Sequence, residues 1–329
     1  MRYLKDLFAV EQKPVKGVLM MEWAMLAYAV LTLPLILVMW TTLTDPMQML
    51  WLRLQGVAMV LALWGVYRMV PCRFTLLARL VGQLLLLGSW YPETFEFNRW
   101  FGNLDHVFAS WEQLLFGFQP ALTFCRDWPQ PWVSEPLTLG YESYYPLMVI
   151  VPLYYLFRRY ADFGRAVFAI IGSFFVFYVI FLCLPAGGPQ YYYPAVGIDN
   201  IAQGIFPPVG DFFQGDYEGL PIPGYQDGLM YKALLVMHAA GERPTAAFPS
   251  SHMGVTTVLL WLAWHSGSRR LFWCLLPLGV LMFFATFYIQ AHYAIDAIAG
   301  VVAGTLIYFL LSALYRKTGP KIECGKFGG

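Results

Sequence analysis

Long apolar segments alternate with shorter polar ones along most of the chain. A helix that crosses a lipid bilayer needs about 20 mostly apolar residues, and eight segments have approximately that length. Their ranges are 17–40, 47–67, 74–90, 136–157, 163–184, 249–266, 271–291 and 293–315. The pattern therefore predicts an all-α integral membrane protein with about eight transmembrane helices.

The composition supports the membrane assignment. Hydrophobic residues make up 59% of the chain and charged residues 12%, whereas a soluble domain is about 25% charged. The net charge of +1 gives no basis for nucleic-acid binding. The 5 cysteines are widely spaced and form no CxxC pair, so neither a disulfide framework nor a zinc site follows from them.

Lysine and arginine residues set the expected orientation, because cytoplasmic loops are enriched in them. With the N-terminus in the cytoplasm, the basic residues concentrate at both termini and in the loops of that side. The opposite side carries only Arg99, Arg126, Lys232 and Arg243. We therefore expect both termini to be cytoplasmic. Arg79, near one end of the third apolar segment, is expected to extend to the membrane surface.

Two long segments lie on the extracytoplasmic side in this topology, and they suggest how the chain is divided. Residues 1–95 form a three-helix N-terminal extension. Residues 96–135 are an extracytoplasmic amphipathic segment, in which 112–117 is expected to lie on the membrane surface. Residues 136–315 form a five-helix catalytic core that contains the extracytoplasmic loop 185–248, and 316–329 are a cytoplasmic tail.

Two histidines fall at the same membrane level in this arrangement. His252 follows Phe248-Pro-Ser-Ser and begins one apolar segment, and His292 begins the last one. The chain crosses the membrane once in each direction between them, so both imidazoles are expected at the extracytoplasmic surface. A lone interfacial histidine is commonly only solvated, but a pair at one level is typical of a catalytic site.

The residues around the histidines are those that phosphoryl transfer needs. Asp296 stands four residues after His292, on the same helix face, where a carboxylate can orient the imidazole and balance its charge; alternatively, it caps the helix. His292 is then a candidate nucleophile and His252 the general acid. Ser250 and Ser251 at a helix start offer an anion site, to which Arg243 adds a bidentate donor.

These motifs resemble a known family. Phe248-Pro-Ser-Ser-His252 and His292-Tyr-Ala-Ile-Asp296 are similar to the second and third signature motifs of the type-2 phosphatidic acid phosphatase superfamily, over roughly residues 100–315. The pattern, including Ala285-Thr-Phe-Tyr288, is most similar to the branch that contains fungal inositol phosphorylceramide synthase. The resemblance implies that His292 forms a phosphohistidine, that Asp296 orients it and that His252 is the acid.

The chain departs from the phosphatase pattern at two cationic positions. Thr286 stands where the phosphatases have an arginine, and Val236 stands where the first motif has a lysine, so that only Arg243-Pro244 remains of that motif. A phosphomonoester dianion needs several cations, whereas a phosphodiester carries one negative charge. The sequence therefore favours transfer from a diester lipid, with Lys232 as a possible second cation.

Further residues are candidates for substrate binding. Glu142 lies among tyrosines inside the fourth segment, where ionisable residues are commonly functional; a structural, hydrogen-bonded role is the alternative. Gln190 and Tyr191 follow Gly187-Gly-Pro189 and line either a headgroup pocket or a turn with interfacial aromatics.

The sequence thus predicts a membrane lipid phosphotransferase that works through a phosphohistidine, without metal or cofactor. Its partners would be a phospholipid or sphingolipid donor and a polyol or lipid acceptor, and the transferred group possibly phosphoinositol. A lipid-phosphate phosphatase using the same residues is the near alternative. A non-catalytic lipid binder or transporter, with the histidines as a proton relay, is the alternative from another class.

Overall fold

The computed structural model describes residues 2–215, 217–238 and 243–320, and the regular secondary structure of these residues consists of helices. An isolated β-bridge joins Val10 and Cys72. The helices are α1 (Arg2–Phe8), α2 (Met20–Val38), α3 (Pro46–Met69), α4 (Arg73–Asn98), α5 (Asp105–Phe116), α6 (Pro120–Asp127), α7 (Pro131–Glu142), α8 (Tyr144–Arg158), η1 (Tyr160–Asp162), α9 (Phe163–Cys183), α10 (Pro189–Val196), α11 (Ile198–Ala202), η2 (Phe212–Gln214), α12 (Leu229–His238), α13 (Ser251–His265), α14 (Arg269–Tyr288) and α15 (Ala294–Thr318).

The chain forms two compact units, each assembled from separate stretches of sequence. The first contains Met1–Glu93, Val149–Val176 and Ile307–Gly329, and the second contains Thr94–Met148 and Phe177–Leu306. Helices α4, α8, α9 and α15 contribute residues to both units. The division into an extension and a core stays a prediction.

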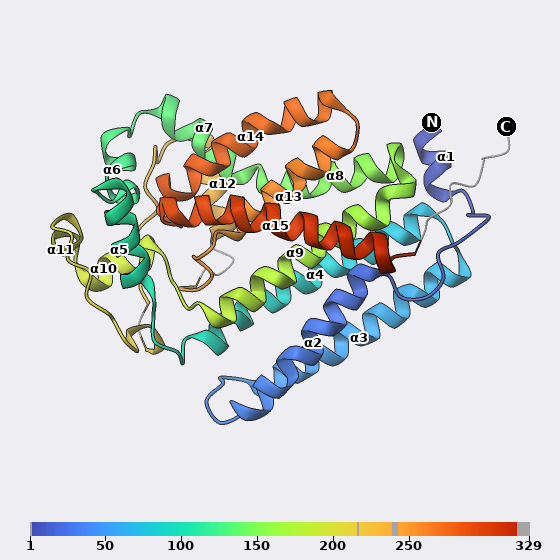
Figure 1. Ribbon diagram of the computed structural model, residues 1–329, viewed down its shortest axis with the longest axis horizontal. Helices are drawn as coiled ribbons and strands as arrows, with labels where there is room; N and C mark the ends of the chain where they lie inside the picture. The colour runs from blue at the N-terminus through green and yellow to red at the C-terminus, as the bar shows by residue number, and fades with distance from the viewer. Residues whose placement is uncertain (1, 216, 239–242, 321–329) are drawn as a thin grey trace. The chain divides into compact units, whose positions relative to one another are not determined.

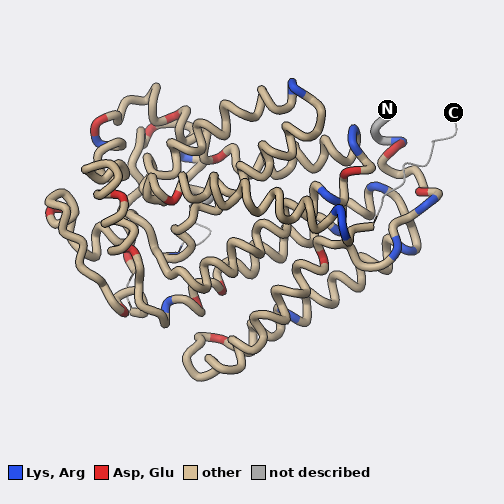
Figure 2. The backbone as a smooth tube through the Cα atoms, in the orientation of Figure 1, with Lys and Arg blue, Asp and Glu red and all other residues tan. Residues whose placement is uncertain are grey.

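Six helices of the described residues are long and apolar enough to cross a membrane. They are Met20–Val38, Pro46–Met69, Arg73–Asn98, Tyr160–Cys183, Arg269–Tyr288 and Ala294–Thr318. Figure 2 shows how few charged residues α14 and α15 carry between their ends. The protein is therefore an all-α, multi-pass membrane protein, as the hydrophobic pattern predicts.

The other two predicted segments, 136–157 and 249–266, do not form single long helices. Residues 136–157 are divided at Ser143 into α7 and α8. Pro146 explains the division, because proline has no N–H to donate to the carbonyl of Glu142 and is tolerated in the first turn of the next helix. Within residues 249–266, the 15-residue helix α13 begins after the N-cap Ser250.

The first unit contains two buried ion pairs. Arg79 Nε donates to Glu22 Oε1 at 2.7 Å, and both side chains are almost completely buried. The expectation that Arg79 reaches the membrane surface is therefore wrong, because its charge is neutralised inside the unit by a carboxylate from another helix. Arg53 pairs with Glu93 at 2.6 Å and lies over the ring of Trp90.

The second unit brings α13, α14 and α15 side by side (Figure 1). Glycines allow α13 and α15 to cross closely, because a Cβ atom on Gly304 would lie 2.2 Å from the carbonyl oxygen of Gly254. A Cβ on Gly300 would lie 2.6 Å from the carbonyl oxygen of Ser250. The Gly-x-x-x-Gly spacing therefore marks a close helix crossing, and this crossing fixes the start of α13 beside the start of α15.

Candidate active site

His252 and His292 lie together in the second unit. His252 stands in the first turn of α13, and His292 stands in the turn between α14 and α15. Their ring centroids are 5.7 Å apart, with 65° between the ring planes. The structure thus brings together two imidazoles that 40 residues separate in sequence, at the end of the helices where α13 and α15 begin.

The hydrogen bond of His292 defines which ring nitrogen is available for chemistry. His292 Nδ1 lies 2.8 Å from the backbone oxygen of Ala247. A carbonyl oxygen can only accept, so Nδ1 carries the proton in this contact and Nε2 keeps its lone pair. The side chain is buried. The arrangement holds the imidazole in the tautomer that a nitrogen nucleophile requires.

Asp296 supports His292 less directly than the sequence suggests. Its Oδ2 lies 3.6 Å from His292 Nδ1, beyond a normal hydrogen bond, and accepts the N–H of Tyr293 at 2.8 Å. The backbone oxygen of Asp296 accepts the N–H of Ser250 at 3.0 Å. The hydrogen bond to the imidazole thus involves the backbone oxygen of Ala247, and the fully buried Asp296 side chain stabilises the turn.

Two tyrosines enclose His252. The Tyr141 ring stacks on the imidazole with centroids 4.7 Å apart, and the Tyr144 ring lies 4.6 Å away. Both tyrosines are buried and stand on either side of the break between α7 and α8. The imidazole is therefore packed between two aromatic rings, and a catalytic role for His252 stays a prediction.

The two serines at the start of α13 have different positions. Ser250 is fully buried, and its Oγ accepts the N–H of Met253 at 3.3 Å as the N-cap. Ser251 is the first residue of α13 and is nearly buried. The helix start beside His252 keeps the positive end of its dipole toward the two imidazoles, and binding of a phosphate there stays a prediction.

The segment that begins with Ala186 packs against the same turn. Ala186 accepts the N–H of Ala247 at 3.1 Å, and Gln190 donates its N–H to Gln290 at 2.9 Å. Gly188 has φ +84, and a Cβ on it would lie 2.6 Å from the oxygen of Ala291. Only glycine fits this position, which brings the segment next to His292.

Buried Asp105 fixes this segment. Its two oxygens accept the N–H groups of Gly187 at 2.7 Å and Gly188 at 2.8 Å. Burial raises the pKa of Asp105, while these N–H donors counter that effect. Asp105 was not among the predicted site residues, because nothing near it in the sequence marks it.

A match to a known protein family covers the residues that form this geometry. The sequence matches the PAP2 superfamily over residues 106–310, which include both histidines and the segments that hold them. The chain belongs to the PAP2 superfamily. Comparison with curated proteins and with solved structures gave no match. Membership of the PAP2 superfamily makes the chain a membrane enzyme of the phosphatase or phosphotransferase type that acts on lipid phosphates.

The positions where the chain departs from the phosphatase pattern are uncharged in this PAP2 protein. The hydroxyl of buried Thr286 donates to Phe283 O at 2.8 Å, and its backbone oxygen accepts the N–H of His292 at 3.1 Å. Val236 lies exposed on α12. Lys232 is also exposed on α12, which packs on α7. Neither α14 nor α12 thus supplies a buried cation at these positions.

Arg243 lies in a small charged cluster with a second arginine. Glu96 Oε1 lies 3.5 Å from Arg243, and Glu96 Oε2 lies 3.1 Å from Arg99. Both guanidinium groups lie near the ring of Phe95, at 5.7 Å and 5.6 Å from its centroid. Sequence reasoning assigned Arg99 and Arg243 to the same side of the membrane but did not connect them, because 144 residues separate them.

Glu112 is a buried carboxyl that the sequence analysis did not single out as a site residue. Helix α5 exposes Leu114 and Leu115 but buries Glu112 completely, and the position of residues 112–117 on the membrane surface stays a prediction. Glu112 Oε2 accepts the N–H of Ile295 at 3.1 Å in the first turn of α15. Burial, with the nearby charge of Asp296, raises the pKa of Glu112 to about 8.

The remaining substrate-binding candidates are Glu142, Gln190 and Tyr191. Glu142 is half-buried and ends α7 next to Tyr141. Gln190 donates its side-chain N–H to Leu220 O at 3.2 Å, and Tyr191 is buried. No group of three His, Cys, Asp or Glu side chains in the part of the chain described here has an arrangement suited to a metal ion.

Proposed function

We propose that this PAP2 protein transfers a phosphoryl headgroup from a phospholipid diester to a lipid or polyol acceptor through a phosphohistidine on His292. The main support is the His292 contact with Ala247, which leaves Nε2 with a lone pair, with the ring of His252 5.7 Å away. One imidazole is thus set up as nucleophile, and the other stands where a proton donor is needed.

The reaction has two balanced steps. In the first, the lone pair of His292 Nε2 forms a bond to phosphorus, and the bond from phosphorus to the diacylglycerol oxygen breaks. Protonated His252 gives its proton to that oxygen. In the second, neutral His252 takes the proton of an acceptor hydroxyl, whose oxygen attacks phosphorus and breaks the bond to His292. The buried carboxylate of Asp296 stabilises the positive imidazole between the steps.

The choice of a diester rests on the charges near the site. Thr286 and Val236 replace two cations of the phosphatase pattern, and Arg243 shares its charge with Glu96. Such a site suits a substrate with one negative charge better than a dianion. The resemblance to the inositol phosphorylceramide synthase branch makes phosphoinositol the first headgroup to test, with a sphingolipid as the first acceptor.

The rates of the two histidine variants should depend differently on the leaving group of the substrate. His292→Ala should abolish turnover and the covalent phosphoenzyme with every substrate. His252→Ala should lose about 10²–10⁴-fold with a lipid leaving group, but an activated aryl phosphodiester should restore part of its rate, because that oxygen leaves without a proton. Rates in detergent and mass spectrometry of the trapped phosphopeptide provide the measurements.

A phosphate trapped on His252, or equal rates for both variants and the wild type, would contradict the proposal. Asp296→Asn serves as the folded control, because the amide keeps the shape of the side chain but cannot balance the charge of the imidazole. Its rate should be reduced. Activity should also survive EDTA, since the chemistry of His292 requires no divalent ion.

A lipid-phosphate phosphatase is the second candidate, and membership of the PAP2 superfamily favours it. The same phosphohistidine would then be hydrolysed by water, with His252 as the base. Dipalmitoyl phosphatidic acid and phosphatidylinositol distinguish the two functions. Release of inorganic phosphate from the first substrate supports the phosphatase, whereas release of diacylglycerol from the second, only when an acceptor alcohol is added, supports the transferase.

A further inference from the structure

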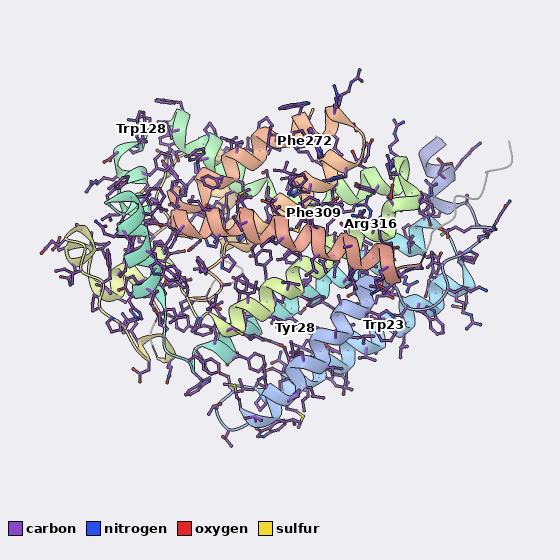
Figure 3. The ribbon with its side chains drawn as sticks, in the orientation of Figure 1. Trp23, Tyr28, Trp128, Phe272, Phe309 and Arg316 are labelled. Atoms are coloured by element: carbon purple, nitrogen blue, oxygen red, sulfur yellow. The ribbon has the colours of Figure 1, made fainter. Side chains whose placement is uncertain are left out.

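An apolar groove of 690 Å³ runs along α13, α14 and α15 in the second unit. Met253, Trp261 and Trp264 line it from α13, Phe272 and Leu276 from α14, and Val301 from α15. Figure 3 labels Phe272, close to the beginning of α14. The volume of the groove is within the range of ligand pockets, about 300–1,000 Å³.

The wall of the groove is almost entirely apolar. Its two threonine hydroxyls already have partners in the protein, because Thr257 donates to the oxygen of Met253 at 2.8 Å and Thr305 accepts from Trp261 Nε1 at 3.1 Å. The other lining groups are mostly hydrocarbon or aromatic. The occupant is therefore a hydrocarbon chain, for which burial against such a wall is favourable.

The length and position of the groove fit one leaflet of a membrane. Met253 and Trp264 are separated along α13 by about 16 Å at a rise of about 1.5 Å per residue. Half of a hydrocarbon core of about 30 Å is about 15 Å. The groove begins at the residue after His252, so a chain that fills it would leave its polar end beside the histidine pair.

We propose that this groove holds one acyl chain of the phospholipid substrate, with the phosphate at His252 and His292. The proposal rests on the function proposed above, and it adds the part of the enzyme that recognises the lipid tail. Exposed Trp264, Val280 and Phe284 line the groove, so it is open along its side and a chain enters laterally from the membrane.

Photocrosslinking tests the binding without requiring turnover. The probe is a phosphatidylinositol whose palmitoyl chain ends in a diazirine, bound to the full-length His292→Ala chain in detergent. Crosslinks should concentrate on peptides with Trp264, Phe272 and Leu276. Unlabelled dipalmitoyl phosphatidylinositol should compete with the probe, and dihexanoyl phosphatidylinositol should compete poorly. Equal labelling around Val302, without competition, would assign the groove to ordinary membrane lipid and overturn the proposal.

A matched pair of substitutions tests the same groove during turnover. Val301 lines the groove, whereas the neighbouring Val302 is exposed elsewhere on α15. Val301→Trp should raise KM for dipalmitoyl substrates by about tenfold or more, since each displaced methylene accounts for about fourfold. It should leave dihexanoyl substrates unchanged, and Val302→Trp should change neither. Leu276→Trp should repeat the effect from α14 if Val301→Trp does not fold.

The two proposals fail in different ways. If the lipid probe crosslinks to the groove but no phosphate is found on His292 of the wild type, the lipid site is retained and the proposed function is rejected. A phosphohistidine on His292 with unchanged KM in Val301→Trp and Leu276→Trp would retain the function and reject the groove.

Discussion

At the scale of single residues, the candidate site depends on how each imidazole is held. The carbonyl of Ala247 fixes the proton of His292, and the rings of Tyr141 and Tyr144 enclose His252. The two side chains are chemically identical but have different neighbours, and the proposed function assigns them different roles for that reason.

Glu112 provides a residue-scale prediction about pH. The folded chain holds a proton on Glu112 up to about pH 8, whereas an unfolded chain releases it near the ordinary value of 4.5. The folded state therefore binds more protons in this interval, and stability falls as the pH rises from 4.5 to 8, by at most about 1.4 kcal/mol per unit. Glu112→Gln keeps an oxygen for the N–H of Ile295 and should remove this dependence.

Thermal unfolding of the wild type and Glu112→Gln in detergent, measured between pH 5 and 8, checks this prediction. The variant should gain stability relative to the wild type as the pH rises. Parallel curves for the two proteins would show that Glu112 does not hold a proton in the folded state.

At the scale of the helices, the histidine pair depends on the close crossing of α13 and α15. The carbonyl of Gly254 faces Gly304 without room for a methyl group. Because α13 begins with Ser251 and His252, any change in this crossing also moves one imidazole relative to the other. The break between α7 and α8 also affects the position of His252, because it places Tyr141 and Tyr144 against the imidazole.

Gly304→Ala tests this dependence. The added Cβ would lie 2.2 Å from the oxygen of Gly254, so α13 and α15 must separate. We expect a loss of about 1–3 kcal/mol in stability and a decrease in rate even with the activated aryl phosphodiester. Gly65→Ala in α3 is the control, because a Cβ there meets nothing within 4 Å. A normal rate in Gly304→Ala would show that the crossing does not position His252.

At the scale of the whole molecule, the orientation in the membrane is the main prediction. The distribution of lysine and arginine residues predicts that both termini lie in the cytoplasm and that the histidine pair lies at the extracytoplasmic face. Within the second unit, α13 and α15 begin beside the site, and the basic start of α14 belongs to the loop after α13. The histidine pair and Arg270 should therefore lie on opposite sides of the membrane.

Cysteine accessibility checks the orientation. Asp211 lies exposed in the loop before α12, and Arg270 lies exposed at the start of α14. In a chain without its native cysteines, Asp211→Cys should react with an impermeant reagent on intact cells. Arg270→Cys should react only after permeabilisation. Labelling of both positions from one side would reject the predicted topology and the location of the site.

The sequence by itself determined the class of the protein and predicted which residues form its central site. The apolar segments required helices in a membrane, and the spacing of His252, His292 and Asp296 indicated phosphoryl-transfer chemistry. Such features are local, because they depend on residue type and on helix or membrane periodicity.

Only the tertiary structure decided which partners those residues have. Ala247, Tyr141 and Glu112 reach the histidines or the start of α15 from other segments, and a buried Glu22 neutralises Arg79 in the first unit. A contact between distant segments depends on how helices pack, and no pattern within a single segment records it. The groove has the same origin, since each of its three helices carries only part of the wall.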